Sequence, residues 1–265
     1  MNKNFNAVYD FANILFAGPC NLRCPYCIGK QVGPALNRDN LGEFPLRGLG
    51  AFVASLRRHR VRQVILTGTT TDPQLYRHEA RLIAWLRERL PGVQLSLHTN
   101  GQLALGKMDV FNCYDRATVS FPAFDPDTYE RMTGSRRVPD LPAILQAARI
   151  PVKVSCVLTE HNAGQVGAFL ARCREIGIRR LAFRHLYGDS RRWDILSGLT
   201  PAGSYRGNPV YDYDGVEVTY WRFERTSCTS LNLFSDGTIS SEYLLTKARS
   251  SREASSSSTV HHIVL

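Results

Sequence analysis

The sequence predicts an α/β fold built around a parallel sheet. Along residues 13–186, short apolar runs alternate with longer stretches whose apolar residues recur at helical spacing. This order is typical of βαβ units, in which a helix returns the chain to the next parallel strand. A chain of 265 residues, 43% of them hydrophobic, is long enough to bury the core of one such domain.

Six strands are expected in the first two thirds of the chain. Each is a short apolar or alternating run that ends at a turn or a polar loop. The expected ranges are 13–17, 63–67, 93–98, 117–120, 152–158 and 179–186.

Helices are expected between these strands. The clearest is 74–90, because its leucines and Ile83 recur at helical spacing and Pro91-Gly92 then ends the pattern. The others are expected at 46–58, 125–132, 139–149 and 163–176.

The pattern changes after Trp193. Short strand-like runs follow at 216–223, 230–234 and 238–243, the last two joined by a turn at Ser235-Asp236-Gly237. We therefore expect an α/β domain at 1–193, a small β-containing extension at 194–245, and a disordered, serine-rich tail at 246–265.

The most specific functional feature is a C-x3-C-x2-C run formed by Cys20, Cys24 and Cys27. A disulfide would need an oxidising compartment and usually an even cysteine count, whereas the chain has 7. Structural zinc needs four ligands, so a distant Cys or His would have to complete the site. Cysteine thiolates are the normal ligands of iron–sulfur clusters, and three of them leave one iron of a cubane open. The spacing favours the cluster, with zinc as the alternative.

This run, with Tyr26 before its last cysteine, resembles the signature of the radical S-adenosylmethionine (SAM) superfamily. The resemblance covers roughly residues 11–190 and continues through four strand-end segments: Leu66-Thr-Gly-Thr-Thr-Thr-Asp-Pro73, Leu97-His-Thr-Asn-Gly101, Thr118-Val-Ser120 and 152–162. It implies a partial (β/α)6 TIM-like barrel with its chemistry at the C-terminal strand ends. It also implies one [4Fe-4S] cluster held by the three cysteines, whose open iron binds SAM and cleaves it to a 5′-deoxyadenosyl radical.

The resemblance further implies SAM contacts at the strand ends. The family usually has Gly-Gly-Glu-Pro where this chain has a threonine-rich segment, so whether Asp72 replaces the glutamate stays open. Asp72 could instead cap the helix that begins near Pro73. The implied SAM-binding residues are Tyr26, Gly68, Thr69, Asp72, Asn100, Ser120, Asn162 and Arg184.

Two residues are candidates for substrate binding, Lys153 and Thr99. The run around Lys153 resembles the fifth strand of the molybdenum-cofactor GTP cyclase, where a matching lysine meets a substrate phosphate. A lysine inside a barrel needs an anionic or other partner, whereas an outward-facing lysine needs none. Thr99 precedes Asn100-Gly101, which as a plain turn is the alternative. Strand alternation allows only one of Arg184 and His185 to face inward.

The other four cysteines are dispersed without paired spacing, so a second cluster and the cyclase's second-cluster region are not expected; they are Cys113, Cys156, Cys173 and Cys228. No apolar run approaches the ~20 residues that span a bilayer. Reduced thiols are typical of the cytoplasm, where we expect the protein to act.

The net charge of +10 favours an anionic partner. The leading prediction is a radical SAM enzyme of a biosynthetic pathway that acts on a small anionic metabolite, such as a nucleotide or sugar phosphate, with a flavodoxin or ferredoxin as electron donor. The alternatives are an activase of a glycyl-radical enzyme and an RNA-modifying radical SAM enzyme. Charge alone supports the latter, because no RNA-binding motif is present. The non-enzymatic alternative is a zinc-stabilised binding module.

Overall fold

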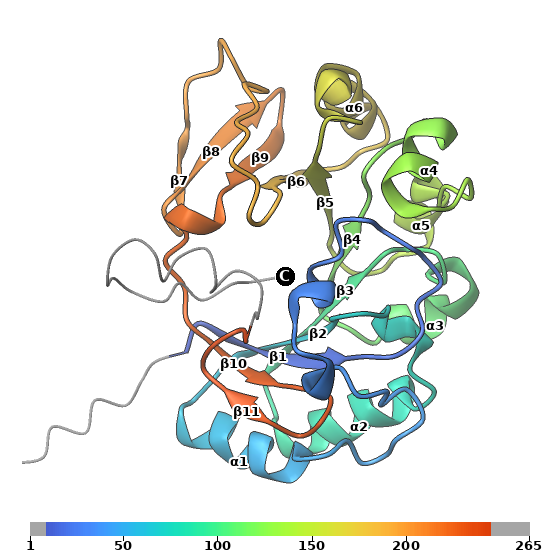
Figure 1. Ribbon diagram of the computed structural model, residues 1–265, viewed down its shortest axis with the longest axis vertical. Coiled ribbons are helices and arrows are strands. Elements are labelled where there is room, and N and C mark those ends of the chain that lie inside the picture. Colours follow the sequence, from blue (N-terminus) through green and yellow to red (C-terminus); the bar gives the residue numbers. More distant parts are fainter. Residues whose placement is uncertain (1–8, 245–265) are drawn as a thin grey trace, which may run out of the picture.

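The computed structural model describes residues 9–244 and contains one continuous sheet (Figure 1). Its eleven strands lie in the order β11-β10-β1-β2-β3-β4-β5-β6-β9-β8-β7. The sheet is not closed, because β11 and β7 form its two ends. The expected tail at 246–265 lies outside the described residues.

The six central strands are parallel and confirm the expected α/β class with a partial, barrel-like sheet. Each lies within a few residues of its predicted range, because a short apolar or alternating run marks it in the sequence. They are β1 (Phe11–Phe16), β2 (Gln63–Gly68), β3 (Gln94–Thr99), β4 (Arg116–Ser120), β5 (Val152–Leu158) and β6 (Arg180–His185).

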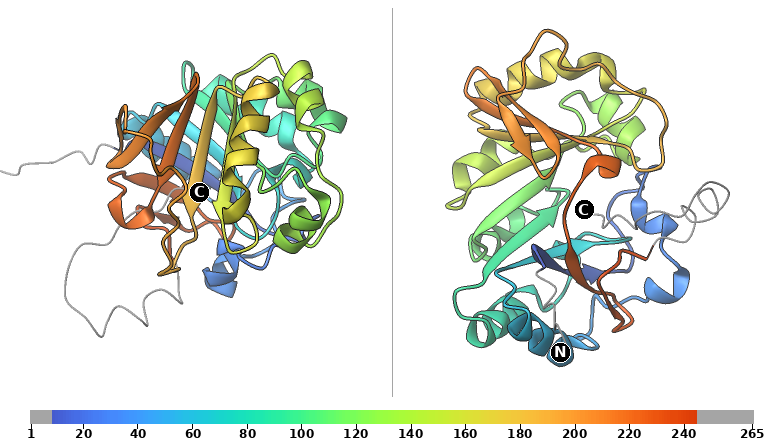
Figure 2. Two further views of the ribbon diagram at one scale, coloured as in Figure 1. Left: turned by 90° about the horizontal axis from the view of Figure 1, so that it is seen from above. Right: turned by 90° about the vertical axis from the view of Figure 1, so that its left-hand side faces the viewer.

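The α-helices lie around the outside of the curved sheet (Figures 1 and 2). They are α1 (Leu49–Arg58), α2 (Glu79–Arg89), α3 (Met108–Phe111), α4 (Pro126–Thr133), α5 (Leu141–Ala147) and α6 (Val166–Glu175). Short 3-10 turns occur at Ile28–Gln31, Pro34–Leu36, Pro73–Leu75, Leu105–Lys107, Ala163–Gln165 and Phe223–Arg225. None of the helices within 9–244 has the length and apolar character that a bilayer crossing needs.

The helix expected at 74–90 is interrupted. Pro73–Leu75 forms a 3-10 turn whose N-cap is Asp72, Tyr76 then adopts an extended backbone, and α2 begins only at Glu79. The capping role considered for Asp72 is thus confirmed, although it caps a single turn and not the long helix.

Residues after Trp193 extend the sheet at both edges. The strands there are β7 (Gly203–Tyr205), β8 (Asn208–Tyr213), β9 (Val216–Trp221), β10 (Ser230–Leu233) and β11 (Ile239–Ser240). β9 runs parallel to β6, and β10 runs parallel to β1. The β1–β10 pair is also joined inside the barrel, where Asn13 Nδ2 donates to Asn232 Oδ1 at 2.7 Å.

Strand alternation separates an apolar outer face from a polar inner face. On β1, β2 and β3 the outward residues pack against α1 and α2 in the main core; they include Ile14, Phe16, Val64, Leu66, Leu95 and Leu97. Asn13, Thr67 and His98 occupy the alternate positions. Apolar burial against the helices therefore leaves polar side chains for the interior of the barrel.

Candidate active site

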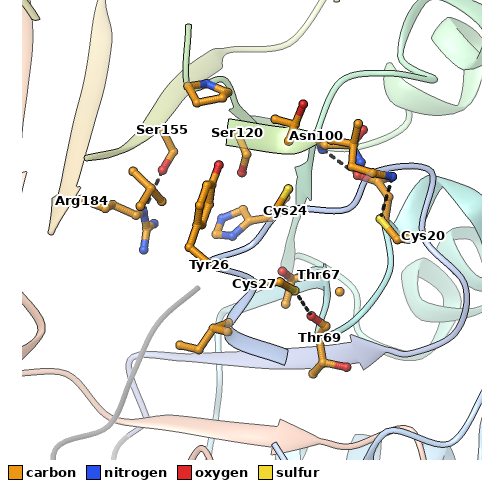
Figure 3. A pocket seen from close by; sticks show the side chains of 18 of the residues that line it. Cys20, Cys24, Tyr26, Cys27, Thr67, Thr69, Asn100, Ser120, Ser155 and Arg184 are labelled. Atoms are coloured by element: carbon orange, nitrogen blue, oxygen red, sulfur yellow. Dashed lines mark hydrogen bonds between the residues drawn. The ribbon is translucent and has the colours of Figure 1, made fainter. Parts of the chain in front are cut away.

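A cavity of about 420 Å³ opens at the C-terminal ends of the central strands. Volumes of this size are typical of small-molecule sites. Of the expected site residues, it brings together Cys20, Cys24, Tyr26, Cys27, Gly68, Thr69, Asp72, Thr99, Asn100, Ser120 and Arg184. Residues far apart in the sequence thus meet at one pocket (Figure 3).

The three motif cysteines are free thiols on the loop that follows β1. Cys20 is exposed and accepts a hydrogen bond from Leu22 N at 3.4 Å, whereas Cys27 donates to the carbonyl oxygen of Thr69 at 3.3 Å. Burial, and then the charges of Cys27 and Cys20, raise the pKa of Cys24 to about 12. All three thiols line the same cavity, where a metal centre would supply the positive charge that keeps them deprotonated.

The donor set fits an iron–sulfur cluster better than a single zinc ion. Within 9–244, no three His, Cys, Asp or Glu side chains are grouped as they would be around one metal ion. A cubane distributes three thiolates over three separate irons, so it does not need that close grouping. The part of the chain that the structure describes therefore holds no closed four-ligand zinc site.

Asp72 braces the end of β3. Its buried carboxylate accepts hydrogen bonds from Gln74 N at 2.9 Å, Thr99 Oγ1 at 2.9 Å and Asn100 N at 2.6 Å. Burial raises the pKa of Asp72, and these hydrogen bonds oppose that rise. The carboxylate therefore fixes Thr99 and Asn100 in place at the pocket.

Asn100 in turn reaches the cysteine loop. Its Nδ2 donates to Asn21 Oδ1 at 2.8 Å, and Asn21 is the residue after Cys20. The expected turn at 99–101 is present, with Gly101 at φ 78° and its N donating to Thr99 Oγ1. This turn thus also links β3 to the cysteines.

Arg184 and Ser155 lie on the other side of the pocket from Cys20 (Figure 3). Arg184 Nε donates to Ser155 Oγ at 2.8 Å, and the guanidinium lies 5.7 Å from the ring centre of Trp221. Burial lowers the pKa of Arg184 to about 10, so it remains a cation at neutral pH. Tyr26 lies between the two sides in this view, and burial raises the pKa of its phenol.

Lys153 is not among the residues that line the cavity. It shares the inward face of β5 with Ser155 and Val157, which do line it, but it lies nearer the start of the strand. Burial, and then the positive charge of Arg184, lower the pKa of Lys153 to about 7. The inward orientation considered for Lys153 is present, whereas direct contact with the cavity is not.

Asn162 also lies outside the cavity lining. Its side chain accepts from Thr159 N at 2.8 Å and donates to the carbonyl oxygens of Val157 and Pro122 at 2.9 and 3.1 Å. These contacts tie the ends of β4 and β5 together and engage both the oxygen and the nitrogen of the Asn162 amide.

Several lining residues were not assigned from the sequence. Thr67, His98, Thr118 and Ser155 line the cavity from inward strand positions, which the two-residue alternation could have identified. Arg184 and His185 both line it, contrary to the expectation of one, because β6 ends at His185. Tyr187 and Phe223 add an aromatic pair with ring centres 5.5 Å apart; no short-range signal links these distant residues.

Comparison with known protein families gives a match over most of the sheet. The model of the Radical SAM superfamily matches residues 14–183. Similar curated proteins include the GTP 3′,8-cyclase of Rhodococcus opacus, 28% identical over 60% of this chain and 46% of that protein. The GTP 3′,8-cyclase of Mycobacterium marinum is 30% identical over 72% of this chain and 57% of that protein. The chain spans about half the length of these relatives.

Solved structures share the fold. Streptococcus suis SuiB bound to S-adenosylmethionine superposes with a TM-score of 0.54 at 17% identity, over 71% of this chain and 43% of SuiB. SuiB bound to its precursor peptide SuiA gives a TM-score of 0.54 at 15% identity, over 68% and 40% of the two chains. At these identities the likeness concerns the partial barrel alone.

Proposed function

Because the chain belongs to the radical SAM superfamily, we propose that the pocket binds SAM beside one [4Fe-4S] cluster held by Cys20, Cys24 and Cys27. When bound, the cluster supplies the electron that cleaves SAM to a 5′-deoxyadenosyl radical, which abstracts hydrogen from a substrate. The observation that carries this proposal is the meeting of all three thiols with polar strand ends at one cavity. The protein's part is to bind, orient and shield the reacting groups.

The strand ends supply the proposed SAM contacts. Tyr26 follows the loop into the pocket and offers an aromatic face and a nearby backbone to an adenine. The Gly68–Thr69 backbone offers carbonyl acceptors for an ammonium group, while Asn100 and Ser120 offer side-chain hydrogen bonds. Arg184 is suited to a carboxylate, which a guanidinium binds through two parallel hydrogen bonds.

We propose a small anionic metabolite as the substrate. Arg184 places one cation in the pocket wall, and Lys153 lies deeper on the neighbouring strand. Thr99, the other candidate contact, lines the cavity but already donates to Asp72. The resemblance to GTP 3′,8-cyclases supports a nucleotide or another phosphorylated molecule of a biosynthetic pathway. Because the chain spans only about half of those proteins, their own substrate is not carried over.

The electron donor is proposed to be a flavodoxin or ferredoxin that docks near Cys20. Cys20 is exposed, and the exposed cations Arg23 and Lys30 lie on the same loop. An acidic protein surface would complement this charge and speed encounter. Thiols as exposed as Cys20 and Cys113 persist in a reducing compartment, so we propose the cytoplasm as the location.

The deciding experiment is anaerobic purification of the full chain, reconstitution with iron and sulfide, and measurement of bound iron, sulfide and zinc. We expect about four irons and four sulfides per chain with a broad visible absorption band. Reductant plus SAM should then yield 5′-deoxyadenosine. Cys24→Ala should abolish both results, whereas Cys113→Ala, at an exposed cysteine outside the pocket, should retain them. A colourless protein with stoichiometric zinc would refute the proposal.

A further inference from the structure

Three consecutive threonines follow β2, and their side chains reach the backbone that leads into Cys20. Gly18 N donates to Thr70 Oγ1 at 3.2 Å, and Thr71 Oγ1 donates to the carbonyl oxygen of Pro19 at 2.6 Å. Thr69 Oγ1 lies 3.1 Å from the carbonyl oxygen of Phe16. The segment just before the first cysteine is therefore bound by side chains from a different loop, more than fifty residues away.

The threonine segment 69–71 also fixes the segment after the last cysteine. Thr69 Oγ1 donates to Asn37 Oδ1 at 2.6 Å, and Asn37 Nδ2 donates to the carbonyl oxygen of Gly29 at 2.8 Å. Gly29 packs so closely that an added Cβ would lie 2.0 Å from the carbonyl oxygen of Thr69. Both ends of the loop that carries the thiols are thus attached to residues 69–71.

These side-chain contacts are additional to the sheet. The β1–β2 ladder already continues through Thr69 N, which donates to the carbonyl oxygen of Phe16 at 2.7 Å. Gly68 makes the turn itself, since a Cβ there would lie 1.7 Å from the carbonyl oxygen of Thr71. The hydroxyls of Thr70 and Thr71 are required neither by the ladder nor by the turn, and their hydrogen-bond partners Gly18 and Pro19 lie in the cysteine loop.

We propose that Thr70 and Thr71 are positioning residues that hold the cysteine loop in its ligand-ready shape before the cluster binds. A loop fixed at both ends loses less conformational entropy when its three thiols converge on one cluster. The hydroxyls therefore slow the release of iron by keeping each thiolate in place after a partial dissociation. This inference rests on the proposed cluster at these thiols.

The first test uses the metal-free full chain and needs no activity. Hydrogen–deuterium exchange is measured for the backbone of residues 17–29 in the wild type and in the double variant Thr70→Val/Thr71→Val. We expect about tenfold faster exchange in the variant, because each lost, partly buried hydrogen bond raises local opening severalfold. The rate at which iodoacetamide alkylates Cys20 should rise together with the exchange rate. Equal exchange in the two proteins would overturn the proposal.

The second test uses the reconstituted protein and follows iron release to an excess chelator. The double variant should lose iron about tenfold faster than the wild type, and Thr71→Ser, which keeps the hydroxyl, should behave like the wild type. If Thr71→Ser loses iron as fast as Thr71→Val, the hydroxyl is not the cause and the proposal fails. If the wild type binds no iron at all, the proposed function fails, while the exchange measurement still tests the loop.

Thr226→Val is the matched control. Thr226 is also buried and donates to a backbone carbonyl, that of Arg222, at 2.7 Å, but it does not line the pocket. Thr226 Oγ1 also accepts from the buried Asn208 Nδ2 at 3.0 Å, so its substitution should lower the urea midpoint at least as much as Thr71→Val, without changing exchange at 17–29 or iron release. Should the double variant fail to fold, Thr70→Val and Thr71→Val are measured singly against this control. Iron release as fast in Thr226→Val as in Thr71→Val would attribute the effect to general destabilisation and overturn the proposal.

Discussion

Arg184 on β6 donates a hydrogen bond to Ser155 on the neighbouring strand β5, with 2.8 Å between Nε and Oγ. Both side chains line the pocket, on the side away from Cys20 (Figure 3). The hydroxyl holds the guanidinium at one end, which reduces the number of rotamers that ligand binding would have to freeze. The pair thus presents a pre-oriented cation to the site.

Arg184→Gln should weaken SAM binding about 10- to 100-fold, because a charge-assisted hydrogen bond to a carboxylate is lost. Ser155→Ala should have a smaller effect, since the cation remains but is less well held. Calorimetric titration of the reconstituted protein with SAM measures both. Arg180→Gln is the control, because Arg180 lies on the same strand and pairs with Glu217 at a half-exposed site outside the pocket. An unchanged SAM affinity in Arg184→Gln would contradict the assignment.

Lys107→Met should lower the free energy of unfolding by about 3–5 kcal/mol, since it leaves a buried carboxylate without its cation. Lys107 pairs with Glu79, which is only 2% exposed and also accepts from the Tyr114 hydroxyl at 3.0 Å. Arg136→Ala, which breaks solvent-exposed pairs with Asp127 and Glu130, should cost much less, because water screens such pairs. Urea unfolding compares them, and similar losses in the two variants would refute the prediction.

Lys153 predicts a pH-dependent stability. Its pKa is about 7 in the folded chain, below the ordinary lysine value that the unfolded chain retains. Between these values the unfolded state binds more protons, so the contribution of Lys153 to the free energy of unfolding rises with pH above about 7. Below pH 7 both states are protonated and the cost of burying the charge is complete.

Lys153→Met should therefore stabilise the protein most at pH 6, and this gain should shrink by roughly 2–3 kcal/mol towards pH 9. Urea unfolding of both proteins at several pH values measures the difference, in which groups common to both cancel. A gain that is the same at pH 6 and pH 9 would show that Lys153 keeps its ordinary pKa.

Local sequence patterns predicted the central sheet because each of its strands is a short apolar or alternating run that ends at a turn or a polar loop. They missed β7 and β8, where Pro209 and polar residues obscure the strand and the hairpin turns through left-handed Arg206 and Gly207. They also predicted site roles for Lys153 and Asn162, whose side chains do not line the cavity. Alternation predicts which face of a strand a side chain lies on, but not how far along the strand it lies from the cavity. A side chain whose hydrogen bonds are all used within the fold, such as that of Asn162, is recognised only from its contacts.

The cysteine motif made the thiols predictable, whereas the support around them was not. The departure at residues 68–73 indicated an unusual turn, but nothing local shows that its hydroxyls bind the backbone at Gly18 and Pro19. Such pairing depends on the parallel register of β1 and β2, which brings Phe16 beside Gly68. Contacts of this kind follow from tertiary structure and not from composition.

Gly29→Ala should disturb the cysteine loop more than its single methyl group suggests. The added Cβ would lie 2.0 Å from the carbonyl oxygen of Thr69, a backbone atom that cannot rotate away, so the two loops must separate. We expect a loss of about 1–3 kcal/mol in the free energy of unfolding and less than half the wild-type iron content after reconstitution. Gly167→Ala on α6 is the control. An added Cβ there would meet no atom within 4 Å beyond its own helix backbone, and alanine is more favourable than glycine in a helix by roughly 0.5–1 kcal/mol. It should be slightly more stable and load iron normally; wild-type iron loading in Gly29→Ala would show that the close approach of the two loops is dispensable.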